Sequence, residues 1–463
     1  MSLTTVIFLI GFLTGLVWAF SRHPIYGLIT YVAVFYLHPP SRWWGAALPD
    51  PGWAMVAAAV TLLAVMTRKD KLPIAPLFKE GVVRGLIVFL VWLLIQSTWA
   101  LDMEMHTELI VLFIKYLVLI VLMYVCIDSE KHLRYFLWVH VLGCFFLGWI
   151  AFTTYTGGRF EGFGGPGIGD ANTGGFIIVT GILTGAGLFL SGKKLERLVL
   201  LGVMPIIVNG LITTISRSGF LAAFVGGMVF NFFSPKQVRK LVMVLSVLAV
   251  GGFFALANET YWDRMNSLKQ AGEEVEGVDT GTSRLVIINA QWEMFQKYPM
   301  GCGHRCTATL SPQYMDDMYL TGPPGHRSRS SHNTFMSMLV EQGIPGALMY
   351  FSMVLWAIVK VFSVWRTARK APGSLPILFP SIAAVCLVMV LGDLFVDYLK
   401  LETRIWFIAL LLIVARMSRV ESTKPVPAVV AAKPIARERT AAQPASTAAR
   451  SHALPQQRKE RPQ

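Results

Sequence analysis

Residues 109–127 read LIVLFIKYLVLIVLMYVCI, an apolar run that holds one charged side chain, Lys115. As a helix, this run would be long enough to cross a hydrocarbon layer of roughly 30 Å. Comparable runs recur along the chain, at 3–20, 24–38, 53–67, 82–99, 133–154, 173–190, 197–215, 219–233, 240–257, 346–364, 375–396 and 404–416. A buried core helix explains one such run but not a series, so we predict an all-α polytopic membrane protein with about 12 or 13 transmembrane helices.

The composition supports this class and argues against nucleic acid as a partner. Of the 463 residues, 54% are hydrophobic and 15% are charged, whereas a soluble domain carries roughly 25% charged residues. The formal net charge is +14, but Lys and Arg gather in short connections and in the final tail rather than on one helix face. We therefore expect membrane lipids, and no nucleic acid, around the chain.

The basic connections also predict the orientation. When the spans alternate, five basic stretches fall on one side, and the positive-inside rule assigns that side to the cytoplasm. These stretches are 68–71, 131–134, 193–194, 236–240 and 366–370. The long connection 258–340 then lies on the opposite side, together with 39–52, 100–108, 155–172 and the turn at 216–218. The first apolar run lacks a basic stretch before it and a small-residue cleavage site after it, so we expect it to be retained.

Four regions follow from this pattern: an N-terminal transmembrane bundle (1–257), a large external loop (258–345), C-terminal transmembrane helices (346–417) and a basic tail (418–463). The tail is rich in Ala, Pro and Arg and poor in large apolar residues, so we predict that it is disordered in the cytoplasm.

The external loop contains two amphipathic patterns. In 282–297 (TSRLVIINAQWEMFQK) apolar residues recur at spacings of three and four, with Thr282 or Ser283 as a possible helix cap. A second helix is predicted over 331–342 (SHNTFMSMLVEQ), after which 343–346 (GIPG) turns the chain into the next span. The loop is therefore predicted to form a small helical cap over the mouth of the bundle.

Three side chains stand out at the external face: Arg217 between two apolar runs, Arg284 at the start of the first loop helix, and His332 in the first turn of the second. An arginine fork suits phosphate oxygens, the start of a helix adds a positive dipole end, and a histidine can accept a proton from a hydroxyl. Structural roles compete with this interpretation. Arg217 could anchor to lipid head groups, Arg284 could form a salt bridge, and His332 could belong to a helix cap.

Other polar residues lie nearby. The glycine-rich stretch 157–175 offers Arg159 and Asn172 as ligand contacts, or is a flexible connector. Asp393, Asp397 and Glu402 lie near the outer end of the penultimate span, where a carboxylate is costly and could orient an arginine. In the long loop, Cys302 and Cys306 flank His304. An oxidising compartment would allow a disulfide there, while a zinc site lacks a fourth ligand.

The chain resembles the O-antigen ligase and polymerase superfamily of bacterial envelope glycosyltransferases. The resemblance rests on ISRSG at 215–219, GTSRLVIINAQWEMFQKYPMGCG at 281–303 and SHNTFMSMLVEQGIPG at 331–346, in the order found in the family. DANTGG at 170–175 is similar to a preceding family loop, with Ala171 where a proline often stands, and HPPSRWWG at 38–45 resembles a subgroup of O-glycosylation ligases.

This resemblance implies a bacterial inner-membrane enzyme with its active site facing the periplasm. The implied donor is a glycan on undecaprenyl pyrophosphate, and the implied acceptor of the ligase branch is the lipid A-core oligosaccharide. Arg217, Arg284 and His332 match the essential arginines and histidine of the family. We add Arg159, Asn172, Asn333 and Asp393 as expected substrate contacts, and we expect inverting transfer without a metal or other cofactor.

Three related activities share this donor: O-antigen ligase, O-antigen polymerase and protein O-oligosaccharyltransferase. A transporter of lipid-linked sugars is a more distant alternative.

Overall fold

The computed structural model describes residues 2–68, 72–256, 281–321, 323, 327–397 and 399–422. Two units divide the chain, Met1–Thr423 and Lys424–Gln463, and the second lies outside the described residues together with the predicted disordered tail beyond 422. The described residues are mainly helical, with an isolated β-bridge between Thr321 and Ser328. The all-α prediction is confirmed for them.

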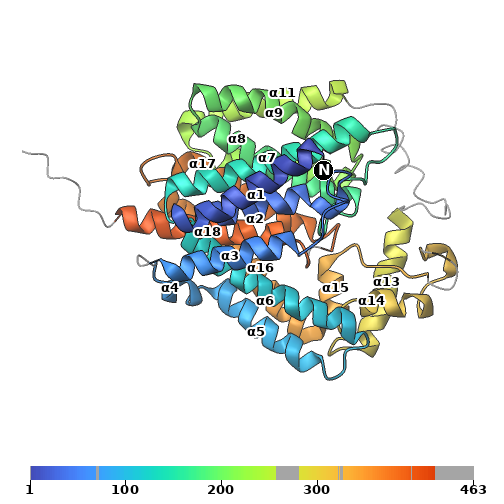
Figure 1. The fold of residues 1–463 in the computed structure, drawn as a ribbon. Coiled ribbons are helices and arrows are strands. Elements are labelled where there is room, and N and C mark those ends of the chain that lie inside the picture. Colours follow the sequence, from blue (N-terminus) through green and yellow to red (C-terminus); the bar gives the residue numbers. More distant parts are fainter. Residues whose placement is uncertain are drawn as a thin grey trace, which may run out of the picture. The chain divides into compact units, whose positions relative to one another are not determined.

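The helices follow the predicted apolar runs closely (Figure 1). The first half of the chain forms α1 (Leu3–Ser21), α2 (Ile25–Leu37), α3 (Trp53–Thr67), α4 (Ala75–Phe78), α5 (Gly81–Gln96), α6 (Met103–Cys126), α7 (Glu130–Thr154), α8 (Ala171–Ser191), α9 (Lys194–Thr213), α10 (Arg217–Phe233) and α11 (Lys236–Leu256). The second half forms α13 (Gly281–Lys297), α14 (Cys306–Leu310), α15 (Thr334–Glu341), α16 (Gly343–Ala368), α17 (Leu375–Gly392) and α18 (Glu402–Ser422).

Seven of the described helices are long and apolar enough to cross a membrane: α1, α6, α7, α8, α9, α16 and α17. Three shorter apolar helices, α3, α5 and α10, accompany them. Length and composition thus define a multi-pass membrane protein, while the total of 12 or 13 spans stays a prediction.

Small residues allow helices of the bundle to pack closely. A Cβ added at Gly210 of α9 would lie 2.9 Å from the Cα of Gly148 on α7, and one added at Gly148 would lie 2.4 Å from the Ile206 carbonyl oxygen. Because the two backbones touch, neither position accepts a side chain without moving a helix.

Contacts between connections define the two ends of the bundle. At the first, which we name the Ser216 end, the Phe160 N–H donates to the Thr213 carbonyl at 3.0 Å, and the Ser216 hydroxyl reaches Asn172 at the start of α8. At the other, the Asp128 end, the α1–α2 and α6–α7 connections meet through His23 and Asp128.

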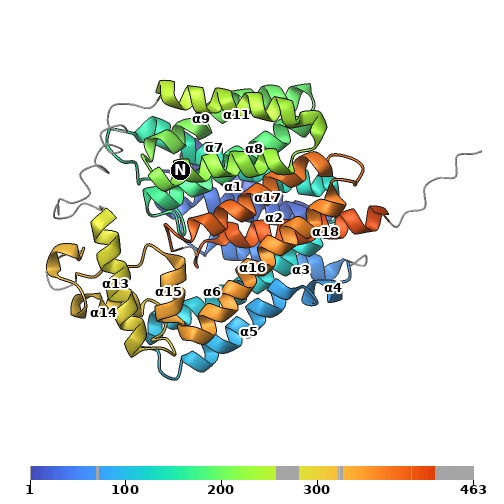
Figure 2. The same cartoon turned by 180° about the vertical axis from the view of Figure 1, so that it is seen from behind.

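Helices α13, α14 and α15 form a second hydrophobic cluster (Figures 1 and 2). Ile287 and Met294 of α13 pack there with Leu310 of α14 and Val340 of α15. These residues come from the predicted external loop, of which 258–280, 322 and 324–326 lie outside the described residues. The prediction of two helices within this loop is confirmed.

Four helix boundaries in the structure differ from the predicted ones. Helix α13 already begins at Gly281, so Thr282 and Ser283 lie inside it rather than capping it. Helix α15 begins only at Thr334, because the Asn333 side chain accepts the Met336 N–H at 3.1 Å. The stretch 343–346 is the first turn of α16 rather than a separate turn, and α18 continues to Ser422 instead of ending before 418.

Candidate active site at the Ser216 end

Two helix starts meet at the Ser216 end. Asp170 caps α8 by accepting the N–H groups of Asn172 and Thr173 at 2.9 and 3.0 Å. Ser216 caps α10 by accepting the Gly219 N–H at 3.1 Å. The two caps are joined, since the Ser216 hydroxyl lies 2.8 Å from the Asn172 side-chain oxygen. The positive dipole ends of α8 and α10 therefore lie side by side.

Arg217 is the first residue of α10 and is half-buried. On either side of it, the hydroxyls of Ser216 and Ser218 lie 2.8 and 3.4 Å from the same oxygen of Asn172. Just before it, Ile215 adopts φ of 46°, which is unusual and unfavourable for a β-branched residue. The structure thus brings the predicted residues Arg217 and Asn172 to one place, in a turn held by specific hydrogen bonds.

The connection between α7 and α8 lies beside this turn. Arg159, also predicted, is 3.5 Å from Glu161. Arg42, which the sequence did not single out, donates to the Leu37 and Gly164 carbonyls at 2.9 and 3.2 Å and so ties HPPSRWWG to this connection. Burial lowers the pKa of Arg42 to about 10, so its guanidinium remains charged at neutral pH.

His332 lies just before α15 rather than in its first turn, and it is half-buried. The following two residues attach it to the connection after α17. The Asn333 side-chain amide donates to Leu394 at 3.4 Å, and the Thr334 N–H donates to the Asp393 carbonyl at 2.8 Å. The predicted residues Asn333 and Asp393 thus take part in the hydrogen bonds that hold the chain next to His332 in place.

The Asp393 carboxylate itself points into the bundle. It accepts hydrogen bonds from Tyr350 of α16, at 2.7 Å, and from Arg404 of α18. The prediction that a carboxylate here orients an arginine is confirmed, but the arginine is Arg404 rather than a residue of the external face. Nothing in the local sequence pattern distinguished Tyr350 or Arg404.

Arg284 lies near the start of α13, the helix that contributes Ile287 and Met294 to the second hydrophobic cluster. Helix α13 packs against α15, so Arg284 and His332 lie on neighbouring elements. Arg217 belongs to the main bundle through α10.

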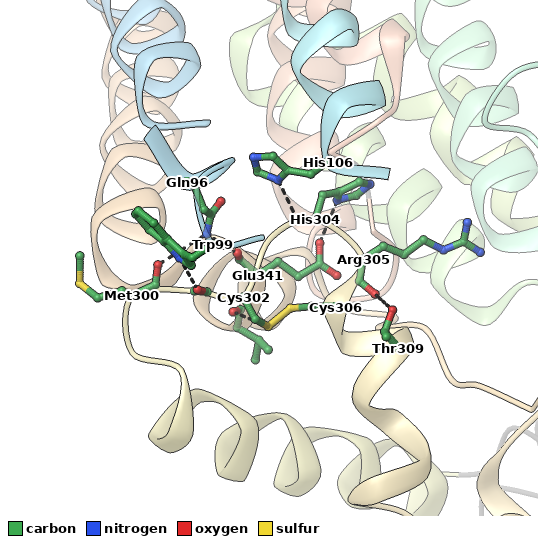
Figure 3. The surroundings of a disulfide bond; sticks show 12 residues. Gln96, Trp99, His106, Met300, Cys302, His304, Arg305, Cys306, Thr309 and Glu341 are labelled. Atoms are coloured by element: carbon green, nitrogen blue, oxygen red, sulfur yellow. Dashed lines mark hydrogen bonds and ion pairs between the residues drawn. A yellow bond between two sulfur atoms is a disulfide. The ribbon is translucent and has the colours of Figure 1, made fainter. Parts of the chain in front are cut away.

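A hydrogen-bonded clasp joins α13–α15 to the α5–α6 hairpin (Figure 3). Gln96 donates to the Glu341 carbonyl at 2.7 Å, Trp92 to the Gln342 carbonyl at 3.0 Å and Trp99 to the Gly301 carbonyl at 3.0 Å. The Leu101 N–H adds a bond of 2.9 Å to the Cys302 carbonyl. We refer to these four contacts as the clasp.

Cys302 and Cys306 form a disulfide next to the clasp. Between them, His304 has its Nδ1 2.9 Å from Glu341. The sequence allowed either a disulfide or a zinc site at these cysteines, and the structure contains the disulfide.

A group of metal-ligating residues occurs at the Asp128 end instead. Atoms of His23, Asp128 and His132 lie within 4.8 Å of one another. However, the Arg68 guanidinium lies against His23 Nε2 and 3.9 Å from Asp128, while His23 Nδ1 accepts the Ile25 N–H. A cationic side chain thus already occupies this group, which acts as a hydrogen-bonded link between connections.

The fold and these contacts define an all-α, multi-pass membrane protein with cationic residues at the starts of its helices. The family described as O-Antigen ligase matches residues 202–351, a region that contains Arg217, Arg284 and His332. This match supports the O-antigen ligase superfamily for the part of the chain that it covers. No curated protein matches the chain.

Proposed function

We propose that the protein transfers an O-antigen polysaccharide from undecaprenyl pyrophosphate to the lipid A-core oligosaccharide, at the periplasmic face of the bacterial inner membrane. The observation that carries the proposal is the O-antigen ligase match over 202–351, which includes all three candidate catalytic residues.

The joined starts of α8 and α10 suit the pyrophosphate of the donor. Arg217 offers a charged donor fork beside two positive helix ends. Because hydroxyls of Ser216 and Ser218 engage the oxygen of Asn172, the amide is oriented with its N–H donors available to a phosphate. Such fixed donors stabilise the charge that develops on the leaving group, and Arg284 supplies a second guanidinium.

The transfer is a single displacement. An acceptor hydroxyl attacks the anomeric carbon, His332 takes the hydroxyl proton, and the bond between that carbon and the pyrophosphate oxygen breaks. Undecaprenyl pyrophosphate leaves with the bonding electrons, and the anomeric configuration inverts. No step requires a metal, so activity should survive EDTA, and a product with retained configuration would contradict the displacement.

The test is complementation of a ligase-deficient Gram-negative strain that makes the matching core, with extracted lipopolysaccharide separated on a gel. Wild type should restore the polymer ladder, whereas His332→Ala and Arg284→Lys should not, because lysine keeps the charge but loses the fork. Arg197→Lys is the matched control, since Arg197 contacts the Phe189 and Leu190 carbonyls at the far end of α8. All variants should be present in the membrane in equal amounts.

The remaining alternatives are outcomes of the same experiment. If wild type gives no ladder on its own core, the lipid A-core acceptor is wrong. Polymerase activity would then appear as longer lipid-linked glycan, and protein O-oligosaccharyltransferase activity as a glycan on Ser or Thr. Movement of lipid-linked sugar across vesicles without any product would indicate a transporter.

A further inference from the structure

Three titratable side chains gather where α15 meets the bundle: His304, Glu341 and Asp397. The side chains of His304 and Glu341 are 4% and 5% exposed and lie 2.9 Å apart. The His304 N–H donates to Nδ1 of His106 at 3.1 Å, and Nε2 of His106 lies 2.8 Å from the Leu93 carbonyl. His106 therefore carries its proton on Nε2 and is neutral.

Asp397 connects this group to the segment after α17. One of its oxygens accepts the Leu399 N–H at 3.2 Å, and the other lies 3.4 Å from the Ser337 hydroxyl on α15. Burial, followed by the nearby charge of Glu341, raises the pKa of Asp397 to about 6, although His304 acts in the opposite direction. Asp393, on the same connection, is the remaining acidic group that faces it.

Helix α15 is held at both ends by this surrounding structure. At its start, Thr334 donates its N–H to the Asp393 carbonyl at 2.8 Å and its hydroxyl to the Val396 carbonyl at 2.7 Å. At its end, the Glu341 carbonyl accepts the Gly303 N–H at 3.0 Å and Gln96 at 2.7 Å. Because α15 has only eight residues, a shift of either end moves the chain that carries His332.

We propose that Asp397 is a positioning residue for the transfer reaction. Its carboxylate holds the first turns of α15 against the connection between α17 and α18, and in this way it places His332. The inference rests on the proposed function, because it assigns His332 the role of proton acceptor.

The physical argument concerns the contacts of the carboxyl group. The Asp397 carboxyl joins the Ser337 hydroxyl of α15 to the Leu399 N–H of the following connection. Glu341 remains bonded to His304 without it, so the far end of α15 stays fixed. Loss of the carboxyl group therefore loosens the part of α15 nearer Thr334, where His332 is attached.

Hydrogen–deuterium exchange of the full chain in detergent tests the placement without any substrate. In Asp397→Ala, exchange in 334–341 at pH 7.5 should be several-fold faster than in wild type, because the contact to Ser337 is lost. In Asp397→Asn, whose amide oxygen can accept the same hydroxyl, exchange should stay close to that of wild type. Asp316→Ala, at an exposed acid of the same cluster of helices, should behave like wild type.

Activity and stability complete the test. Asp397→Ala should lower kcat by about 10-fold to 100-fold, as small misplacements of reacting groups do, with KM for the donor unchanged. Asp397→Asn keeps an oxygen that accepts the Ser337 hydroxyl and should restore most of this activity. Because the pKa of Asp397 is raised, its ionisation costs stability as the pH rises from about 4 to about 6, so Asp397→Asn should melt no lower than wild type at pH 7.5. A loss of kcat in Asp397→Asn as large as that in Asp397→Ala would refute the role of the contact.

The two proposals fail separately. If Asp397→Ala exchanges like wild type, or if Asp397→Asn exchanges as fast as Asp397→Ala, the positioning role is refuted whether or not the protein transfers glycans. If exchange behaves as expected but wild type transfers no glycan to any acceptor, the proposed function fails, while Asp397 still places α15.

Discussion

Replacement of Gly343 by alanine should loosen the attachment of α13–α15 to the bundle. Gly343 begins α16 with φ of 66°, and a Cβ there would lie 2.2 Å from the Met300 carbonyl carbon and 2.4 Å from the Gly301 nitrogen. Both are backbone atoms, so rotation of a side chain cannot relieve the overlap.

The cost has two parts. A left-handed conformation costs a residue with a Cβ roughly 1–2 kcal/mol, and overpacking of a tight site costs typically about 1–3 kcal/mol. Together they give about 2–5 kcal/mol, more than a single hydrogen bond contributes at about 1 kcal/mol. The variant should therefore relieve the overlap by moving residues 300–303, which breaks the clasp bonds of Trp99 and Leu101.

The assay is denaturant titration in bicelles, followed by tryptophan fluorescence, with limited trypsin digestion to detect release of α13–α15. Gly202→Ala is the control, because Gly202 is an exposed position of α9 where a Cβ would meet nothing within 4 Å, and alanine favours a helix by up to about 1 kcal/mol. The reasoning is refuted if the two variants differ by less than about 0.5 kcal/mol and are digested equally.

Three further predictions concern other contacts. The Cys302→Ser/Cys306→Ser variant should lose about 2 kcal/mol of stability, the value expected for a short closed loop. Reductant should lower the unfolding midpoint of wild type but not that of this variant. Equal midpoints of wild type with and without reductant would contradict this prediction. Arg404→Met leaves the buried Asp393 without its cationic partner and should lower the free energy of unfolding by about 3–5 kcal/mol. The Asp393→Asn/Arg404→Met variant should recover part of this stability. Strictly additive losses would show that the two side chains do not interact. Burial raises the pKa of Asp128, but hydrogen bonds from His132 and His23 outweigh burial and hold this pKa well below its usual range. Asp128→Asn should therefore lower stability at pH 7. The difference in stability from wild type should persist down to about pH 4 and shrink at lower pH. An equal difference at pH 3 and pH 7 would argue against an effect of the charge.

Local patterns predicted the elements well, because the information they use is contained within one helix. The apolar runs gave the bundle, and spacings of three and four gave α13 and α15. The boundaries were less accurate where a polar side chain competed with the helix, as at Asn333, whose own hydrogen bond to Met336 delays the start of α15 and leaves His332 outside it.

Contacts between distant segments could not be read from the sequence. Gln96 donates to the carbonyl of Glu341, 245 residues away. The sequence does not indicate this partner, because every residue carries a main-chain carbonyl. Nothing in the sequence distinguished Arg404, yet its guanidinium pairs with the Asp393 carboxylate inside the bundle. For the site, the resemblance indicated which residues to consider, and only the packing of α8 against α10 showed that Asn172 orients the turn around Arg217.

The clasp has a consequence for how this part of the molecule can change. Its bundle side chains, Gln96, Trp92 and Trp99, all bind main-chain carbonyls of the opposing segment. A carbonyl remains when the residue that carries it is replaced, so these hydrogen bonds themselves do not depend on the side chains at 341 and 342. Position 301 is different, because Gly301 has φ of 81° and an added Cβ would lie 2.6 Å from the backbone of Gln342. Such contacts allow the side chains of the α13–α15 segment to change, or the segment to be exchanged for that of another protein with the same backbone path. The three donors on the α5–α6 hairpin would still hold the new segment in the same position.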